Sequence, residues 1–165
     1  MKSVAMAVIL GIVAWIAPSV FTSGPVSPRQ KAESELLQIH LDELAAHRKT
    51  DVDAVLAHAQ DQFVYVRDGK ISRTDVSAMR DQMRQYFKDA TYYLYEDLEP
   101  PVIRASEDGT MGWIISRVRA RRSQKDATGK SNSEEFVYAG ITTYEVKGGK
   151  WYQVSNASTF EPTPQ

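Results

Sequence analysis

The chain has 165 residues, of which 42% are hydrophobic and 25% charged, and this composition is typical of one globular domain with enough apolar material for a core. Its 20 basic and 21 acidic side chains give a formal net charge of -1, which excludes the global positive field that non-specific nucleic-acid binding needs. The sequence lacks cysteine, which excludes disulfides, a thiol nucleophile and cysteine-ligated zinc.

The N-terminus has the pattern of an export signal. A basic residue precedes the uninterrupted apolar run Val4–Ala17, which is short for a membrane span of about 20 residues. Small residues nearby would allow cleavage before Val20 or before Ser23. We therefore expect residues 1–22 to be a signal peptide, and the mature protein to be periplasmic or secreted. If the segment is not cleaved, residues 4–21 would anchor the protein in a membrane.

Helical patterns dominate the next part of the chain. Between 29 and 49, apolar residues recur every three or four positions, which predicts a long amphipathic helix. Thr50 or Asp51 can cap a second, shorter helix, because a short side-chain oxygen satisfies the free amides of the first turn. The β-branched and aromatic stretch 62–69 then predicts a strand that ends in an Asp-Gly turn, and a third helix starts at Thr74.

After Lys88 the hydrophobic period changes to two, which predicts a meander of antiparallel strands. Pro100 and Pro101 mark a bend or an edge there, because proline cannot donate a ladder hydrogen bond. The expected strands cover 90–100, 101–106, 112–122, 134–146 and 151–160. We predict an α+β domain at 29–160, with three N-terminal helices packed on the concave face of a curved, mostly antiparallel sheet, a flexible lead-in at 23–28 and a polar tail at 161–165.

Strand alternation sorts the side chains between two faces. In WIISRVRARR the arginines cannot be buried without partners, so Arg117, Arg119 and Arg121 are expected on the outer face and Ile114, Ser116, Val118 and Ala120 on the inner face. A two-residue turn at Gly148-Gly149 would pair Val146 with Trp151 and Thr142 with Ser155. This register predicts an outer set of Tyr138, Thr142, Tyr144, Val146, Trp151, Gln153 and Ser155. The smaller, more apolar inner set is Val137, Ala139, Ile141, Thr143, Val154, Asn156 and Ser158.

The order of elements resembles the nuclear transport factor 2-like superfamily, and within it the SnoaL-like proteins. The resemblance runs from Glu33 to Phe160 and is strongest in TDVDAVLAHAQDQFVYV, DGTMGWIISRVRA and TTYEVKGGKWYQVSNAS. It implies a cone-shaped fold with a ligand cavity between the helices and the concave face, and dimerisation through the outer face. It implies no single reaction, since relatives include isomerases, cyclases, hydrolases and binding modules.

The catalytic groups of the ketosteroid isomerases, which belong to this superfamily, have no counterpart at the matching positions. The base position falls at Val66 or Arg67, the buried acid at Ile141 and the tyrosine near Asp42 or Glu43. Asp68 is the nearest acidic candidate for a general base. His40, His47 and His58 are expected to be structural, because metal binding would need further ligands, and no cofactor is expected.

Two groups of site residues follow from these assignments. The expected ligand-binding residues are Val66, Tyr86, Ser116, Ile141, Thr143, Asn156 and Ser158. Asn156 could contact a ligand or bond a neighbouring strand or helix, since a buried amide needs partners. The expected interface of a homodimer on the outer face contains Arg117, Arg119, Tyr138, Tyr144 and Trp151.

The sequence therefore predicts an exported, non-catalytic protein that binds a small, mostly apolar molecule in its cavity, dimerises and does not bind nucleic acid. One alternative is a SnoaL-like isomerase, cyclase or hydrolase that uses Asp68 or a first-helix carboxylate as general base. A carboxylate inside the cavity with a raised pKa would support it. Another alternative is a protein-interaction module without a cavity.

Overall fold

The computed structural model describes residues 25–126 and 128–161. The expected signal or anchor at 1–22 lies outside the described residues. None of the described helices is both long and apolar enough to cross a membrane.

The first helix, α1, spans Pro28–Arg48 and starts with a reciprocal cap. The Ser27 hydroxyl accepts a hydrogen bond from the Gln30 amide at 3.2 Å, and the Gln30 side chain accepts one from the Ser27 amide at 3.0 Å. These two bonds satisfy amides that a helix start otherwise leaves free. Of the apolar residues on α1, Leu36 is fully buried whereas its neighbour Leu37 is 41% exposed, so one side of the helix forms the core.

The strand predicted at 62–69 is one half of a hairpin. Strand β1 (Ala59–Arg67) pairs with β2 (Lys70–Asp75), which the sequence analysis did not predict. Asp68 and Gly69 both have positive φ, as a tight hairpin turn requires. The third helix, α3 (Val76–Phe87), therefore starts after β2, and the short α2 spans Val52–Val55.

The sheet has the strand order β2-β1-β7-β6-β5-β3 and is not closed. Its further strands are β3 (Ala90–Asp97), β4 (Val102–Ala105), β5 (Met111–Lys125), β6 (Ser131–Lys147) and β7 (Lys150–Phe160). Among the strands of the described residues, only β1 and β7 pair in parallel, so the sheet is mostly antiparallel. Both β3 and β4 pair with β5, and Pro100 and Pro101 lie in the break between them.

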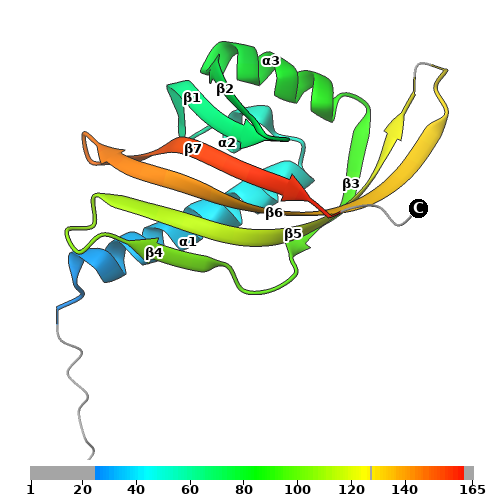
Figure 1. The fold of residues 1–165 in the computed structure, drawn as a ribbon. Coiled ribbons are helices and arrows are strands. Elements are labelled where there is room, and N and C mark those ends of the chain that lie inside the picture. The colour runs from blue at the N-terminus through cyan, green and yellow to red at the C-terminus, as the bar shows by residue number, and fades with distance from the viewer. Residues whose placement is uncertain (1–24, 127, 162–165) are drawn as a thin grey trace, which may run out of the picture.

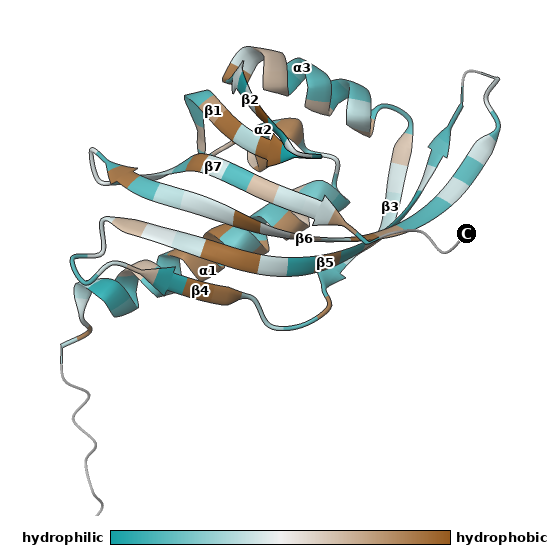
Figure 2. Cartoon of the chain, viewed as in Figure 1, coloured by the Kyte–Doolittle hydropathy of each residue, from teal (hydrophilic) through white to brown (hydrophobic). Residues whose placement is uncertain are grey.

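The helices cover the concave side of this sheet, which confirms the predicted α+β architecture (Figure 1). Helix α1 packs against β3, β4 and β5, and α3 packs against β1, β2 and β3. Hydrophobic residues gather on β4 and the middle of β5, whereas the far end of the β5–β6 hairpin is hydrophilic (Figure 2). The core therefore lies under the middle of the sheet and not under its projecting hairpin.

A bulge in β7 changes the register that the sequence predicted. Close to the turn, Val146 pairs with Trp151 as expected, but beyond Gln153 the register shifts by one and Thr142 pairs with Asn156. Val154 is the extra residue of the bulge. Because it interrupts the alternation of β7, the odd-numbered side chains before it and the even-numbered side chains after it face the same side of the sheet. Trp151, Gln153, Asn156 and Ser158 consequently all lie on the inner face.

The predicted faces of β6 were reversed. Residues opposite each other in an antiparallel pair share a face, and Ser116 and Val118 on the inner face of β5 pair with Gly140 and Tyr138. Tyr138, Gly140, Thr142 and Tyr144 therefore point inward, and Val137, Ala139, Ile141 and Thr143 point outward. The size of the side chains was a poor guide, because α1 leaves room for the large tyrosines.

Candidate functional site

A pocket of about 320 Å³ lies between the helices and the inner face of the sheet. Two buried clusters border it: one packs Leu36 of α1 against Tyr144 and Trp151, and the other packs Leu44 of α1 against Val118. The aromatic residues that line it, here called the aromatic wall, are Phe63, Tyr86, Tyr95, Phe136, Tyr138, Tyr144 and Phe160. The aliphatic lining residues are Leu44, Val55, Leu56, Met79, Met83 and Ile114. The uncharged polar groups that reach it are Ser116, Thr142, Gln153, Asn156 and Ser158.

One face of α1 supplies ionisable groups to this pocket. His40, Glu43 and His47 are spaced by three and four residues, so they lie on the same side of the helix. Glu43 is partly buried and lines the pocket. Its side-chain hydrogen bond comes from the Tyr144 hydroxyl at 3.4 Å. Removal from water raises the pKa of Glu43 to about 7, and the bond from Tyr144 offsets part of this rise.

The two histidines beside Glu43 have structural partners. His47 bonds the Glu43 carbonyl oxygen through Nδ1 at 2.9 Å and stacks on the Tyr95 ring at 4.4 Å. Burial lowers the pKa of His47 to about 4, so its ring is neutral at pH 7. His40 Nε2 lies 3.0 and 2.9 Å from the two carboxylate oxygens of Asp97. Within the described ranges, no group of three acidic or histidine side chains could hold a metal ion.

Three tyrosines of the pocket, Tyr95, Tyr138 and Tyr144, remain protonated at neutral pH. The Tyr95 and Tyr138 hydroxyls share a hydrogen bond of 2.8 Å. Burial raises the pKa of Tyr95, Tyr138 and Tyr144 above the ordinary value, and the nearby Glu43 carboxyl adds to the shift of Tyr144. These three tyrosines are therefore hydroxyl donors and not tyrosinates.

Of the predicted ligand-binding residues, Tyr86, Ser116, Asn156 and Ser158 line the pocket. Asn156 lines the pocket and donates to the Thr142 hydroxyl of β6 at 2.9 Å, so its bond to a neighbouring strand is confirmed and its contact with a ligand stays a prediction. These four positions lie where the predicted contacts require, and their role in binding remains a prediction.

The other three predicted ligand-binding residues lie elsewhere. Ile141 and Thr143 point outward because the faces of β6 are reversed, and the Thr143 hydroxyl bonds that of Ser155 at 2.7 Å. Val66 is 39% exposed and does not line the pocket, whereas the neighbouring Arg67 does. The expected contacts at these three positions were therefore wrong.

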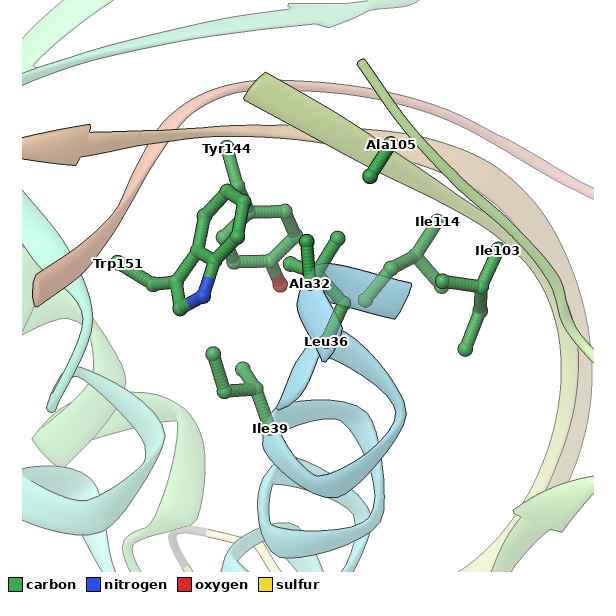
Figure 3. Packing of buried hydrophobic residues seen from close by; sticks show 8 residues of the cluster. All are labelled: Ala32, Leu36, Ile39, Ile103, Ala105, Ile114, Tyr144 and Trp151. Carbon is green, nitrogen blue, oxygen red and sulfur yellow. The ribbon is translucent and has the colours of Figure 1, made fainter. Parts of the chain in front are cut away.

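The aromatic part of the predicted interface is also wrong. Tyr138, Tyr144 and Trp151 point inward, and Figure 3 shows Tyr144 and Trp151 packed beside Leu36 and Ile39 of α1. The Trp151 indole donates to Glu35 at 2.8 Å, which satisfies its buried N–H.

The predicted arginines do lie on the outer face. Arg117 bonds Glu161 at 3.1 Å, and Arg119 lies 3.5 Å from a carboxylate oxygen of Glu135. Their place in an interface remains a prediction. The last arginine of the motif, Arg122, turns inward, where its guanidinium lies 4.3 Å from the centre of the Tyr86 ring and bonds the Glu134 carboxylate.

The candidate base Asp68 is not in the pocket. It lies in the β1–β2 turn with its side chain 85% exposed, and a turn of this kind projects into solvent. The carboxyl that does reach the pocket is Glu43, one of the first-helix carboxylates that the sequence left open. Its spacing of three and four residues from His40 and His47 indicated that the three side chains share one face of the helix. The sequence alone did not show that this face borders a pocket.

No known protein-family model matches this chain, and no curated protein sequence is significantly similar to it. Solved structures do match. A ketosteroid isomerase-like protein from Erwinia carotovora atroseptica has a TM-score of 0.62 at 14% identity, covering 81% of this chain and 98% of the other.

An NTF2-like protein of unknown function from Pseudomonas putida has a TM-score of 0.58 at 16% identity, covering 81% of this chain and 97% of the other. The association domain of C. elegans CaMKII has a TM-score of 0.54 at 11% identity, covering 79% and 96%. At these identities the likeness establishes the fold alone. The helices on a curved, open sheet and these structural neighbours together show that the chain has the nuclear transport factor 2-like fold.

Proposed function

We propose that this protein is an exported, non-catalytic protein that binds a small, mostly apolar molecule in the pocket between α1, α3 and the sheet. The pocket volume of about 320 Å³ lies in the range of small-molecule sites. The observation that carries the proposal is the Glu43 carboxyl, which faces an aromatic wall with a single long hydrogen bond from Tyr144. A carboxyl in such a place costs folding free energy, and ionisable groups in such places are often retained for a function.

The test is a pair of matched substitutions on β6. Thr142→Phe would place a ring in the pocket, whereas Thr143→Phe would place it on the outer face. Each change removes one side-chain hydrogen bond, so the two variants differ mainly in where the ring lies. Native mass spectrometry of the protein isolated from its own compartment should find a bound small molecule in the wild type and Thr143→Phe. Equal occupancy in Thr142→Phe would contradict the proposal.

A second candidate function is acid–base catalysis by Glu43, which its pKa of about 7 favours. Binding without catalysis is preferred because most other polar groups of the pocket are already bonded to the protein. His40 is held by Asp97, and His47 by a backbone carbonyl. Catalysis of proton transfer would place deuterium on carbon when the recovered ligand is incubated with the protein in D2O. Glu43→Gln should abolish that exchange, and wild-type protein without exchange would exclude the enzyme.

We also propose that the protein forms a homodimer through its outer sheet face. Trp113, Ile115 and Ile141 are 39%, 43% and 37% exposed there, and cross-strand pairing of β5 with β6 makes them neighbours. An exposed apolar group next to arginine is typical of interface cores. One structural neighbour is itself an association domain.

Sedimentation at micromolar concentration should show a dimer that Ile115→Glu or Arg117→Glu dissociates. Arg73→Glu on β2 is the control, because this exposed residue lies on a different part of the sheet. A wild-type monomer would exclude the dimer.

A further inference from the structure

The ionisable groups that line the pocket differ in whether a partner already neutralises them. His40 faces the Asp97 carboxylate, and Arg67 lies 3.6 Å from the Asp68 carboxylate with its guanidinium over the Phe160 ring. His47 is neutral at pH 7 because burial lowers its pKa to about 4. Glu43 forms no ion pair with any described residue. Its carboxylate is the charge in the pocket that still lacks a counter-ion.

The surroundings of Glu43 favour a cation over other partners. The rings of Tyr95, Tyr138 and Tyr144 line the same pocket, and aromatic faces attract an ammonium group electrostatically. The hydroxyl of Tyr144 already donates to Glu43, so the carboxylate has acceptor sites left for further N–H donors. An anionic ligand would instead meet a like charge.

We propose that the ligand of this pocket is a small organic ammonium ion, a protonated amine with an apolar body, whose charged nitrogen binds the Glu43 carboxylate. This inference rests on the proposed binding function and specifies its ligand class. The apolar body lies against the aromatic wall, and the ammonium donates hydrogen bonds to Glu43. The pocket volume limits the body to a size near that of a single ring with a short chain.

The protonation of Glu43 makes this assignment testable. A carboxyl with a pKa of about 7 is mostly neutral at pH 6 and mostly ionised at pH 8. An ammonium needs the ionised form, so its affinity should rise about tenfold between these pH values. A neutral acceptor needs the protonated form, and its affinity should fall instead.

Other titratable groups line the pocket, and four of them keep one protonation state between pH 6 and pH 8. Tyr144 and Tyr138 on β6 and Tyr95 on β3 remain protonated, because their pKa values are raised. On α1, His47 stays neutral from pH 6 to 8. His40, which contacts Asp97, and Arg67 also line the pocket, so a pH effect is assigned to Glu43 only if it disappears in Glu43→Gln.

Three probes of similar size and different charge test the inference by calorimetry at pH 6 and pH 8: benzylamine, benzyl alcohol and benzoate. We expect benzylamine to bind the wild-type protein most tightly, with affinity about tenfold higher at pH 8. Glu43→Gln should bind it at least tenfold more weakly at pH 8, without the pH dependence. The control is Asp42→Asn, because Asp42 is exposed and bonds Gln38 outside the pocket.

The outcomes separate the two levels of the proposal. If benzyl alcohol or benzoate binds the wild type more tightly than benzylamine, the ammonium assignment is wrong and the binding pocket stands. If none of the three probes binds, both are wrong. These comparisons use only wild-type protein, so they remain decisive if Glu43→Gln fails to fold. A recovered natural ligand without a basic nitrogen would also overturn the assignment.

Discussion

On the outer face of the sheet, Arg121 lies 2.8 Å from Glu135, and both side chains are about half exposed to water. On the inner face, Glu43 lies against a pocket, 3.4 Å from an uncharged tyrosine hydroxyl. Water and salt screen the outer pair, so that either charge could be lost at little cost. The inner carboxyl has no such screening, and its protonation depends on the surrounding fold. The proposed function therefore rests on the inner carboxyl and not on the outer ion pair.

The largest expected difference between the inner and outer sides is in packing. Leu36→Ala should lower the free energy of unfolding by about 3 kcal/mol, because it leaves a cavity beside Tyr144 in the core. Leu37→Ala, one residue along the same helix, removes a side chain that is 41% exposed and should cost less than about 1 kcal/mol. Urea denaturation of both variants makes the comparison. Similar losses would mean that α1 does not bury the face described.

The next largest effect is on the pH dependence of stability. Glu43 and His47 of α1 change the free energy of unfolding in opposite directions as the pH rises. The folded pKa of Glu43, about 7, is above its ordinary value of 4.5, so its contribution to stability falls as pH rises from about 4.5 to 7. The folded pKa of His47, about 4, is below its ordinary value of 6.5, so its contribution is lost as pH falls from about 6.5 to 4. Between pH 4.5 and 6.5 the two slopes oppose each other.

In Glu43→Gln the contribution of His47 is no longer opposed. The free energy of unfolding of this variant should therefore increase by about 2 kcal/mol as the pH rises from 4.5 to 6.5. His47→Gln should give the opposite slope, with a similar magnitude. The measurement is the midpoint of urea unfolding at several pH values, with Glu135→Gln on the outer face as control. A Glu43→Gln profile parallel to that of the wild type would show that Glu43 titrates normally.

The smallest effect is expected on the outer face. Arg121→Ala should change the free energy of unfolding by less than about 1 kcal/mol, because its ion pair with Glu135 is exposed and Arg119 can still pair with the same carboxylate. What remains of the effect should diminish in 0.5 M salt. Thermal unfolding at low and high salt tests this, and a salt-independent loss would mean that the arginine has a packing role.

The sequence predicted the fold better than the site. The three helices, the long strands and the inner face of β5 were predicted from periodicity and from the cost of burying arginine. The same reasoning was not applied to β6, where Glu135 and Glu145 alternate in step with Ile141 and Thr143, and side-chain size was used instead. Pairing with β5 decides that face, since Tyr138 lies opposite Val118. The sequence pattern also did not predict the bulge at Val154, because a hairpin turn fixes the strand register only up to the first irregularity.

By itself, the sequence determined most of the segments that form helices and strands, though not β2, and it placed Arg117, Arg119 and Arg121 on the outer face. Local periodicity and the cost of desolvating charge act within a single element, so they can be read from the sequence alone. Only the tertiary structure decided that Glu43 borders a pocket and that Tyr144 reaches it from a strand 101 positions away in the chain. The pKa of a carboxyl depends on how much water and which dipoles surround it, and distant segments supply both.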